Sequence, residues 1–309
     1  RSAEDAGFGM KLFAMSTVLN TGLNYLLIFG KCGLPALGIQ GAAVATLLAR
    51  ITEFAVCSFC AVRSRLLPIQ WRAFFRPGWE MLQRFVKYSS PVILNETAWG
   101  LGNSMLTVIL GYTDNSVEML AANAVMGNLN RLFLVVCFGL GAATAVIIGK
   151  SIGEGRSHQE VMDLSRTLLV FTALVGVGLT ILSLLLGPTL FVPVVFPLFK
   201  LYGESAAIAT ALAVTGFLSI PLHAYSISAV TGVLRAGGDV FWSTLLDVGP
   251  QWCMALPLTA LLALVLKAHY WWIAAAIQSE SLLKVPLCAL RIRTGQWIHD
   301  VTVRKERGQ

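Results

Sequence analysis

The chain has 309 residues, of which 56% are hydrophobic and 13% charged, and its formal net charge is +7. Soluble globular proteins carry about 25% charged residues, so this composition, with its mean hydropathy of +0.72, excludes a soluble protein and indicates an integral membrane protein. The positive charge does not indicate nucleic-acid binding, because the basic residues lie between long apolar runs, where they orient membrane helices.

Apolar runs of the length that a bilayer requires, about 20 residues per helix, recur along the chain. They predict an all-α integral membrane protein, a polytopic bundle of about eight transmembrane helices. The expected spans lie near residues 12–30, 38–62, 89–112, 118–149, 165–187, 206–234, 241–266 and 270–290.

The one sizeable polar connection, residues 63–87, separates the second span from the third. Its aromatic residues and interleaved arginines suit an amphipathic helix at the membrane interface. One alternating set of loops and termini holds seventeen lysines and arginines, whereas the other holds only Lys31, Lys200 and Lys267. Because positively charged loops stay on the cytoplasmic side, we expect the linker and both termini of this chain to be cytoplasmic, in a multi-pass protein of the plasma membrane.

The third span carries an acid, Glu96, close to its centre. An ionisable side chain at that depth costs several kcal/mol unless it is paired, hydrated or protonated, so it marks a functional-site hypothesis by default. On a helix, Glu96, Gly100, Asn103 and Thr107 fall on one face at i, i+4, i+7 and i+11. We interpret this polar stripe as part of a site. The alternative is an acid that only holds two helices together.

Three other spans carry polar residues at the same helical spacing. These stripes either line a central cavity or hold transmembrane helices together, and the pattern alone does not separate the two. Pro221 is expected to kink the sixth span because it lacks a backbone N–H. In the eighth span, Glu280 and Lys284 stand at i and i+4 and are expected to neutralise each other. The stripes are Thr17, Asn20 and Asn24 in the first span, Asn123, Gly127 and Asn130 in the fourth, and Ser219, His223 and Ser226 in the sixth.

Several sequence motifs together resemble those of one family, the multidrug and toxic compound extrusion (MATE) transporters, over nearly the whole chain. The order and spacing of these sequence motifs make the resemblance strong. They are IFGKCGLPALGIQGAAVAT at 28–46, the third span with Pro91 and Asn95-Glu96, LAANAVMGNLNRL at 120–132 followed by IIGKSIGEGR, GVLRAGGD at 232–239, and RIRTGQWIHD at 291–300.

The resemblance implies twelve helices in two six-helix lobes around a central cavity, of which this chain supplies the last eight. Residues 1–62 would be the last helix pair of the N-terminal lobe, 63–87 a cytoplasmic linker, 88–290 the complete C-terminal lobe and 291–309 a cytoplasmic basic tail. The helices that are missing would then be a required partner, so we expect the 309-residue chain alone not to transport.

The resemblance also gives Glu96 a role, because the acid on the family's seventh helix is commonly a cation-coupling or substrate-binding residue. Some members carry a second acid on the tenth helix, where this chain has His223 and Tyr225 instead. That difference leaves either protons or sodium as the coupling ion. The candidate cation-coupling or substrate residues are Glu96, Asn103, Asn123, Asn130, His223 and Tyr225.

The function expected is export of organic, cationic small molecules by proton- or sodium-coupled antiport, with two lobes that rock around a site between them. Neither a cofactor nor a metal is expected. A flippase or exporter for lipid-linked oligosaccharides or polysaccharides is the alternative within transport, because Arg50 and Arg131 could supply positive charge for pyrophosphate. An intramembrane enzyme is the alternative outside transport. It would need catalytic side chains clustered at membrane depth, such as paired aspartates or a nucleophile with a histidine, and the sequence shows no such cluster.

Overall fold

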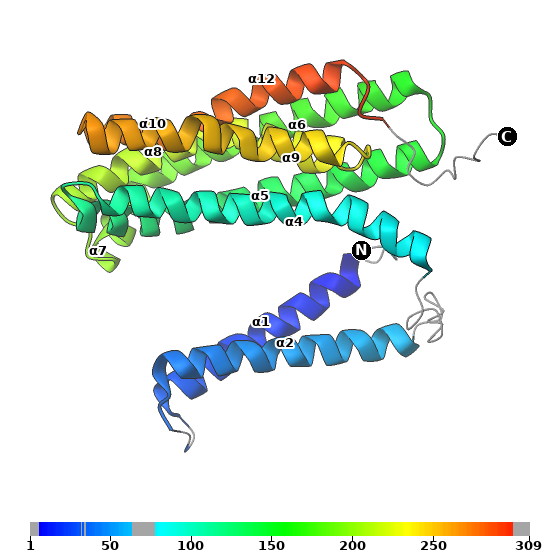
Figure 1. Cartoon of the computed structure of the whole chain (residues 1–309). Helices are drawn as coiled ribbons and strands as arrows, with labels where there is room; N and C mark the ends of the chain where they lie inside the picture. The colour runs from blue at the N-terminus through cyan, green and yellow to red at the C-terminus, as the bar shows by residue number, and fades with distance from the viewer. Residues whose placement is uncertain (1–5, 32, 34, 64–77, 299–309) are drawn as a thin grey trace. The chain divides into compact units, whose positions relative to one another are not determined.

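The computed structural model describes residues 6–31, 33, 35–63 and 78–298. Within these ranges the regular elements are helices, as the all-α prediction expects (Figure 1). They are α1 (Ala6–Phe29), α2 (Gly38–Arg63), α4 (Trp79–Gly111), α5 (Ser116–Gly153), α6 (His158–Leu186), η1 (Gly187–Val195), α7 (Phe196–Leu198), α8 (Glu204–Ile227), η2 (Ser228–Leu234), α9 (Val240–Pro250), η3 (Gln251–Ala255), α10 (Leu256–Ala260), η4 (Leu261–Val265), α11 (Tyr270–Ile277) and α12 (Ser279–Arg293), where η marks a π-helical segment.

The chain divides into two compact units, residues 1–83 and 84–309. The first is a hairpin of α1 and α2, which approach closely because Gly41 has no side chain. A Cβ atom at Gly41 would lie 2.5 Å from the carbonyl oxygen of Leu27. Asn20 of the polar stripe on α1 donates a hydrogen bond to Thr46 of α2 at 3.4 Å, so part of this stripe serves helix packing.

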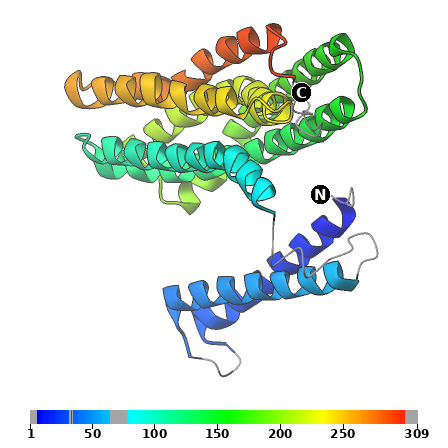
Figure 2. The same ribbon diagram turned by 45° about the vertical axis from the view of Figure 1, so that its right-hand side comes forward.

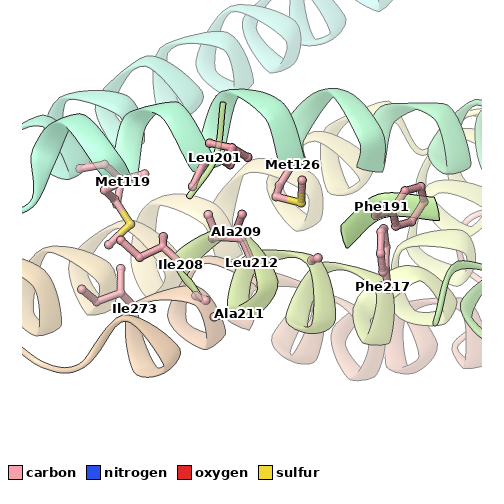
Figure 3. Close-up of a cluster of buried hydrophobic side chains, with 14 of the residues drawn as sticks. Met119, Met126, Phe191, Leu201, Ile208, Ala209, Ala211, Leu212, Phe217 and Ile273 are labelled. Carbon is pink, nitrogen blue, oxygen red and sulfur yellow. The ribbon is translucent and has the colours of Figure 1, made fainter. Parts of the chain in front are cut away.

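In the second unit, α8 is the central helix and packs against α5, α6, α11 and α12. In both views α12 lies beside the run from α9 to α10 (Figures 1 and 2). One apolar cluster joins α5 and α8 to the segments that flank them (Figure 3). Phe217 of α8 anchors it, with ring centroids 5.4 Å from Phe133 and 5.5 Å from Phe191.

A second apolar cluster lies where α5, α6, η2 and α12 meet. Its largest member is Trp297, which is fully buried and donates a hydrogen bond to the carbonyl oxygen of Ile292 at 3.1 Å. Residues 291–298, the first part of the expected basic tail, are therefore packed against the second unit. The rest of that tail, residues 299–309, lies outside the described residues.

Among the described residues, seven stretches are long and apolar enough to cross a membrane, and they correspond to all the expected spans except the third. The third is a helix of 33 residues, α4, but the polar residues around Glu96 dilute its apolar character. It begins at Trp79 rather than near residue 89. Most of the expected linker, residues 64–77, lies outside the described ranges.

The helix α8 runs through Pro221 without ending there and continues into the π-helical segment η2. Its neighbour α6 places a glycine against the proline. A Cβ atom at Gly176 would lie 2.7 Å from the Cα atom of Pro221 and 3.0 Å from the Cβ atom of Ala224. The close crossing of α6 and α8 therefore depends on the absence of a side chain at Gly176.

We predict that Gly176→Ala lowers the free energy of unfolding by about 1–3 kcal/mol, the usual cost of overpacking a core, because the backbone of α8 must move away. Gly178 is the matched control, since it lies on the exposed side of the same helix with no atom within 4 Å of a Cβ position. Gly178→Ala should leave stability unchanged or raise it slightly, because alanine favours helix. Thermal unfolding in detergent compares the two variants, and equal midpoints would show that the crossing is not tight.

Candidate functional site

A cluster of charged side chains lies inside the second unit, with Asp247 of α9 at its centre. Its Oδ1 accepts a hydrogen bond from Nζ of Lys284 on α12 at 3.0 Å. Its Oδ2 accepts one from Nδ2 of Asn95 on α4, also at 3.0 Å. Lys284 and Asn95 are buried. One carboxylate thus links three helices that are far apart in the sequence.

Arg235 lies between Asp247 and Glu96, the acid that the sequence analysis identified as a site candidate. Its guanidinium places NH1 3.6 Å from Oε1 of Glu96 and NH2 3.8 Å from Oδ2 of Asp247. The π-helical segment η2 ends immediately before Arg235, whose backbone N–H donates to the carbonyl oxygen of Val230 at 3.0 Å. Such segments are frequent at functional sites, and this one sets the position from which the arginine reaches both carboxylates.

The side chain of Glu96 is 64% exposed on the second unit, whereas that of Asp247 is 22% exposed. Gly100, Asn103 and Thr107 are also exposed, so the predicted polar stripe lies on the exposed side of α4. The buried side of this helix carries Asn95, Gly102, Ile109 and Leu110. Glu96 is therefore the exposed end of a charged cluster that is otherwise largely buried.

His223 of α8 and Glu280 of α12 form a second pair, with Nε2 and Oε1 3.7 Å apart. The expected neutralisation of Glu280 by Lys284 is wrong as a direct contact, because among the described residues the ion pairs run from Glu280 to His223 and from Lys284 to Asp247. The reason is that α12 packs against both α8 and α9, so each side chain meets a partner on a different helix.

The remaining candidates from the sequence lie apart from this cluster. Asn103 donates its amide to the carbonyl oxygen of Trp99 in its own helix at 3.0 Å. Asn130 packs against α8 at Gly216, and Asn123 is half-buried on α5. Tyr225 packs against the second apolar cluster. Within the described part of the chain, none of these four forms a hydrogen bond or ion pair with the charged cluster.

Sequence reasoning missed Asp247 and Arg235 as members of the site. A signal for Asp247 was present, because it is an acid inside the apolar run 241–266 and therefore meets the same criterion that singled out Glu96. No comparable signal pairs Asp247 with Lys284. Within the ranges that the structure describes, no group of three or more His, Cys, Asp or Glu side chains is arranged to hold a metal ion.

Comparison with known proteins supports the resemblance seen in the motifs. The chain is 25% identical over 158 residues to a probable multidrug resistance protein NorM of Thermotoga maritima, a match that covers 51% of this chain and 33% of that protein. It is 27% identical over 269 residues to the multidrug resistance protein MdtK of Pectobacterium atrosepticum, covering 83% and 54% respectively. The chain thus spans about half the length of curated relatives that it matches. No family model matches it.

Solved structures of MATE proteins are similar to this chain in fold. A crystal structure of a MATE protein in complex with MaL6 superimposes with a TM-score of 0.79 at 17% identity, covering 94% of this chain and 64% of that one. The outward-facing conformation of a multidrug resistance MATE family transporter gives a TM-score of 0.76 at 19% identity with the same coverage. These relatives belong to a family of transporters rather than of enzymes. In sequence the chain is therefore similar to curated multidrug resistance proteins, and in fold it is similar to multidrug and toxic compound extrusion (MATE) transporters.

Proposed function

We propose that the protein exports organic cations by secondary active antiport, driven by a proton or sodium gradient, with alternating access between two lobes. The observation that carries this proposal is the exposed carboxylate of Glu96, which ends a buried cluster of opposite charges. An exposed acid on a helix inside a membrane protein attracts cations, and its link through Arg235 makes the buried charges respond to what it binds. The names of the relatives as multidrug resistance proteins support export of organic compounds.

Competition for the charge of Glu96 is the proposed basis of coupling. An organic cation and the guanidinium of Arg235 both form ion pairs with this carboxylate. A bound cation therefore changes the net charge around Asp247. Trp99 is 43% exposed close to Glu96 on α4, and an aromatic ring of this kind attracts cations through its face. In the proposed topology both termini of the chain are cytoplasmic and the protein lies in the plasma membrane.

The alternative of a flippase for lipid-linked sugars depends on positive charge at Arg50 and Arg131. Arg50 is paired with Glu53 at 2.6 Å, and Glu53 also accepts a hydrogen bond from Ser16 at 2.8 Å. This pairing offsets the charge that an anionic pyrophosphate would need. Within the described residues, the flippase alternative is therefore left with the positive charge of Arg131, which is exposed on α5.

The proposal is tested by export of a fluorescent organic cation, ethidium, from vesicles that contain the protein expressed from its whole reading frame. A proton gradient and a sodium gradient are imposed in separate experiments. We expect one of the two to drive export, and we expect export to stop when the matching ionophore collapses that gradient. Vesicles made without protein provide the background. Export at the same rate without any ion gradient would contradict secondary active transport.

A further inference from the structure

The imidazole of His223 faces a hydrogen-bond acceptor at each of its two nitrogens. Nδ1 lies 3.1 Å from the carbonyl oxygen of Ser219, one turn earlier in α8, and Nε2 lies 3.7 Å from Oε1 of Glu280. A carbonyl oxygen only accepts, so Nδ1 carries a hydrogen. In a neutral imidazole the other nitrogen then has a lone pair, and here that lone pair would face a carboxylate oxygen. One additional proton between Nε2 and Glu280 turns this repulsion into attraction.

The net charge of the whole cluster is also one proton short of zero. It contains three carboxylates, Glu96, Asp247 and Glu280, and two permanent cations, Arg235 and Lys284. With a neutral His223 the net charge of these groups, the exposed Glu96 included, is −1, and with one added proton it is zero. The side chains of His223 and Glu280 are only 21% and 15% exposed, and an uncompensated charge is costly where water is excluded.

The neighbours of His223 offer few other charges that could balance it. From α12 it faces Glu280, and Lys284 interacts electrostatically with both Glu280 and Asp247.

The helix α6 meets α8 at Gly176, whereas the charged residues of α6 lie near its other end, between 160 and 166. The described residues of α11 carry no charged side chain. On α5, Arg131 is exposed and Cys137 is buried. Asp239, the residue before α9, is paired with Arg291.

We propose that His223 and Glu280 hold one exchangeable proton between them, and that this proton is the coupling ion of the transporter. This inference rests on the proposed function and deepens it, since Glu96 then contacts the cargo while the proton is held elsewhere. A monovalent organic cation at Glu96 gives the cluster one positive charge too many. The cluster returns to neutrality when the Nε2–H bond breaks and the proton leaves to water. Uptake of a proton from the other side restores the starting charge and expels the cargo.

The protonation state of His223 is measured directly by nitrogen NMR on the purified full chain, labelled at its four histidines. Loss of one signal in His223→Gln assigns the ring. We expect both ring nitrogens of His223 to be protonated near neutral pH in the free protein, and saturation with tetraphenylphosphonium to convert the ring to its neutral form. In a weakly buffered solution, about one proton should be released per bound cation, since the proposed exchange frees one proton for each cation that binds.

Two variants separate the pair from other sources of protons. Glu280→Gln keeps the shape of the side chain but removes its charge, so His223 should become neutral and the proton release should fall to zero. His269→Gln is the matched control, because His269 is exposed in the loop before α11, and this variant should release protons as the wild type does.

The outcomes for the proton site and for the proposed function are distinguishable. A wild-type His223 that stays neutral from pH 5 to 8, or a proton release that is unchanged in both His223→Gln and Glu280→Gln, overturns the proton site. Failure of tetraphenylphosphonium to bind the wild type contradicts the substrate class proposed above. In that case the NMR spectrum of the free protein still decides whether the pair holds a proton.

Discussion

Replacing Glu96 with glutamine is expected to lower ion-coupled export of an organic cation by a factor of about ten or more, equivalent to about 1.4 kcal/mol. Glutamine preserves the shape of the side chain and its hydrogen bonding but removes the negative charge. The cation then loses its exposed carboxylate, and Arg235 loses one of its two acidic partners. Binding should also stop changing with pH or sodium concentration. The measurements are export from loaded vesicles and equilibrium binding across both conditions.

A surface acid provides the matched control for this variant. Glu154 lies in the loop after α5, where it forms an exposed pair with Arg156 at 3.0 Å. Exposed pairs of this kind contribute about 0–1 kcal/mol, so Glu154→Gln should export normally. If Glu96→Gln also pumps with unchanged ion dependence, Glu96 is a packing residue and the organic cation binds elsewhere in the protein.

Removing one partner of the Asp247–Lys284 pair is expected to destabilise the second unit by about 3–5 kcal/mol, because the other charge is left buried without compensation. Asp247→Asn leaves Lys284 in this position, with a side chain that is 8% exposed. Lys284→Met leaves Asp247 with only Asn95 and the more distant Arg235. The double variant Asp247→Asn with Lys284→Met should recover most of the loss, since neither charge remains. Unfolding in detergent measures all three variants as a double-mutant cycle.

The control for this cycle is the exposed pair of Asp114 and Lys267, which are 2.9 Å apart with side chains 71% and 65% exposed. Asp114→Asn should change stability by about 1 kcal/mol or less. Losses in the double variant that equal the sum of the single losses would show that Asp247 and Lys284 act independently. A double variant that folds well but no longer exports would place the pair in the transport machinery.

Much of the fold could be predicted from local sequence, for a physical reason. A bilayer demands about 20 apolar residues per crossing, and every backbone polar group must be satisfied within the helix. Length and composition therefore placed the helices at nearly their observed positions, and an acid in an apolar run was enough to single out Glu96. The helix α4 shows the limit of this criterion, since its own polar residues keep it below the apolar content of the other spans.

The sequence by itself determined the membrane class, the helices and one acid of the candidate site, because those follow from properties of contiguous residues. Only the tertiary structure decided which charges meet. Asn95 and Asp247 are 152 positions apart, and Asp247 is 37 positions from Lys284. Helical spacing suggested that Glu280 and Lys284 neutralise each other, but the packing of α12 against two helices gave each a different partner. A side chain in a bundle pairs with the charge that the neighbouring helices bring to it, and periodicity along one helix contains no information about that neighbour.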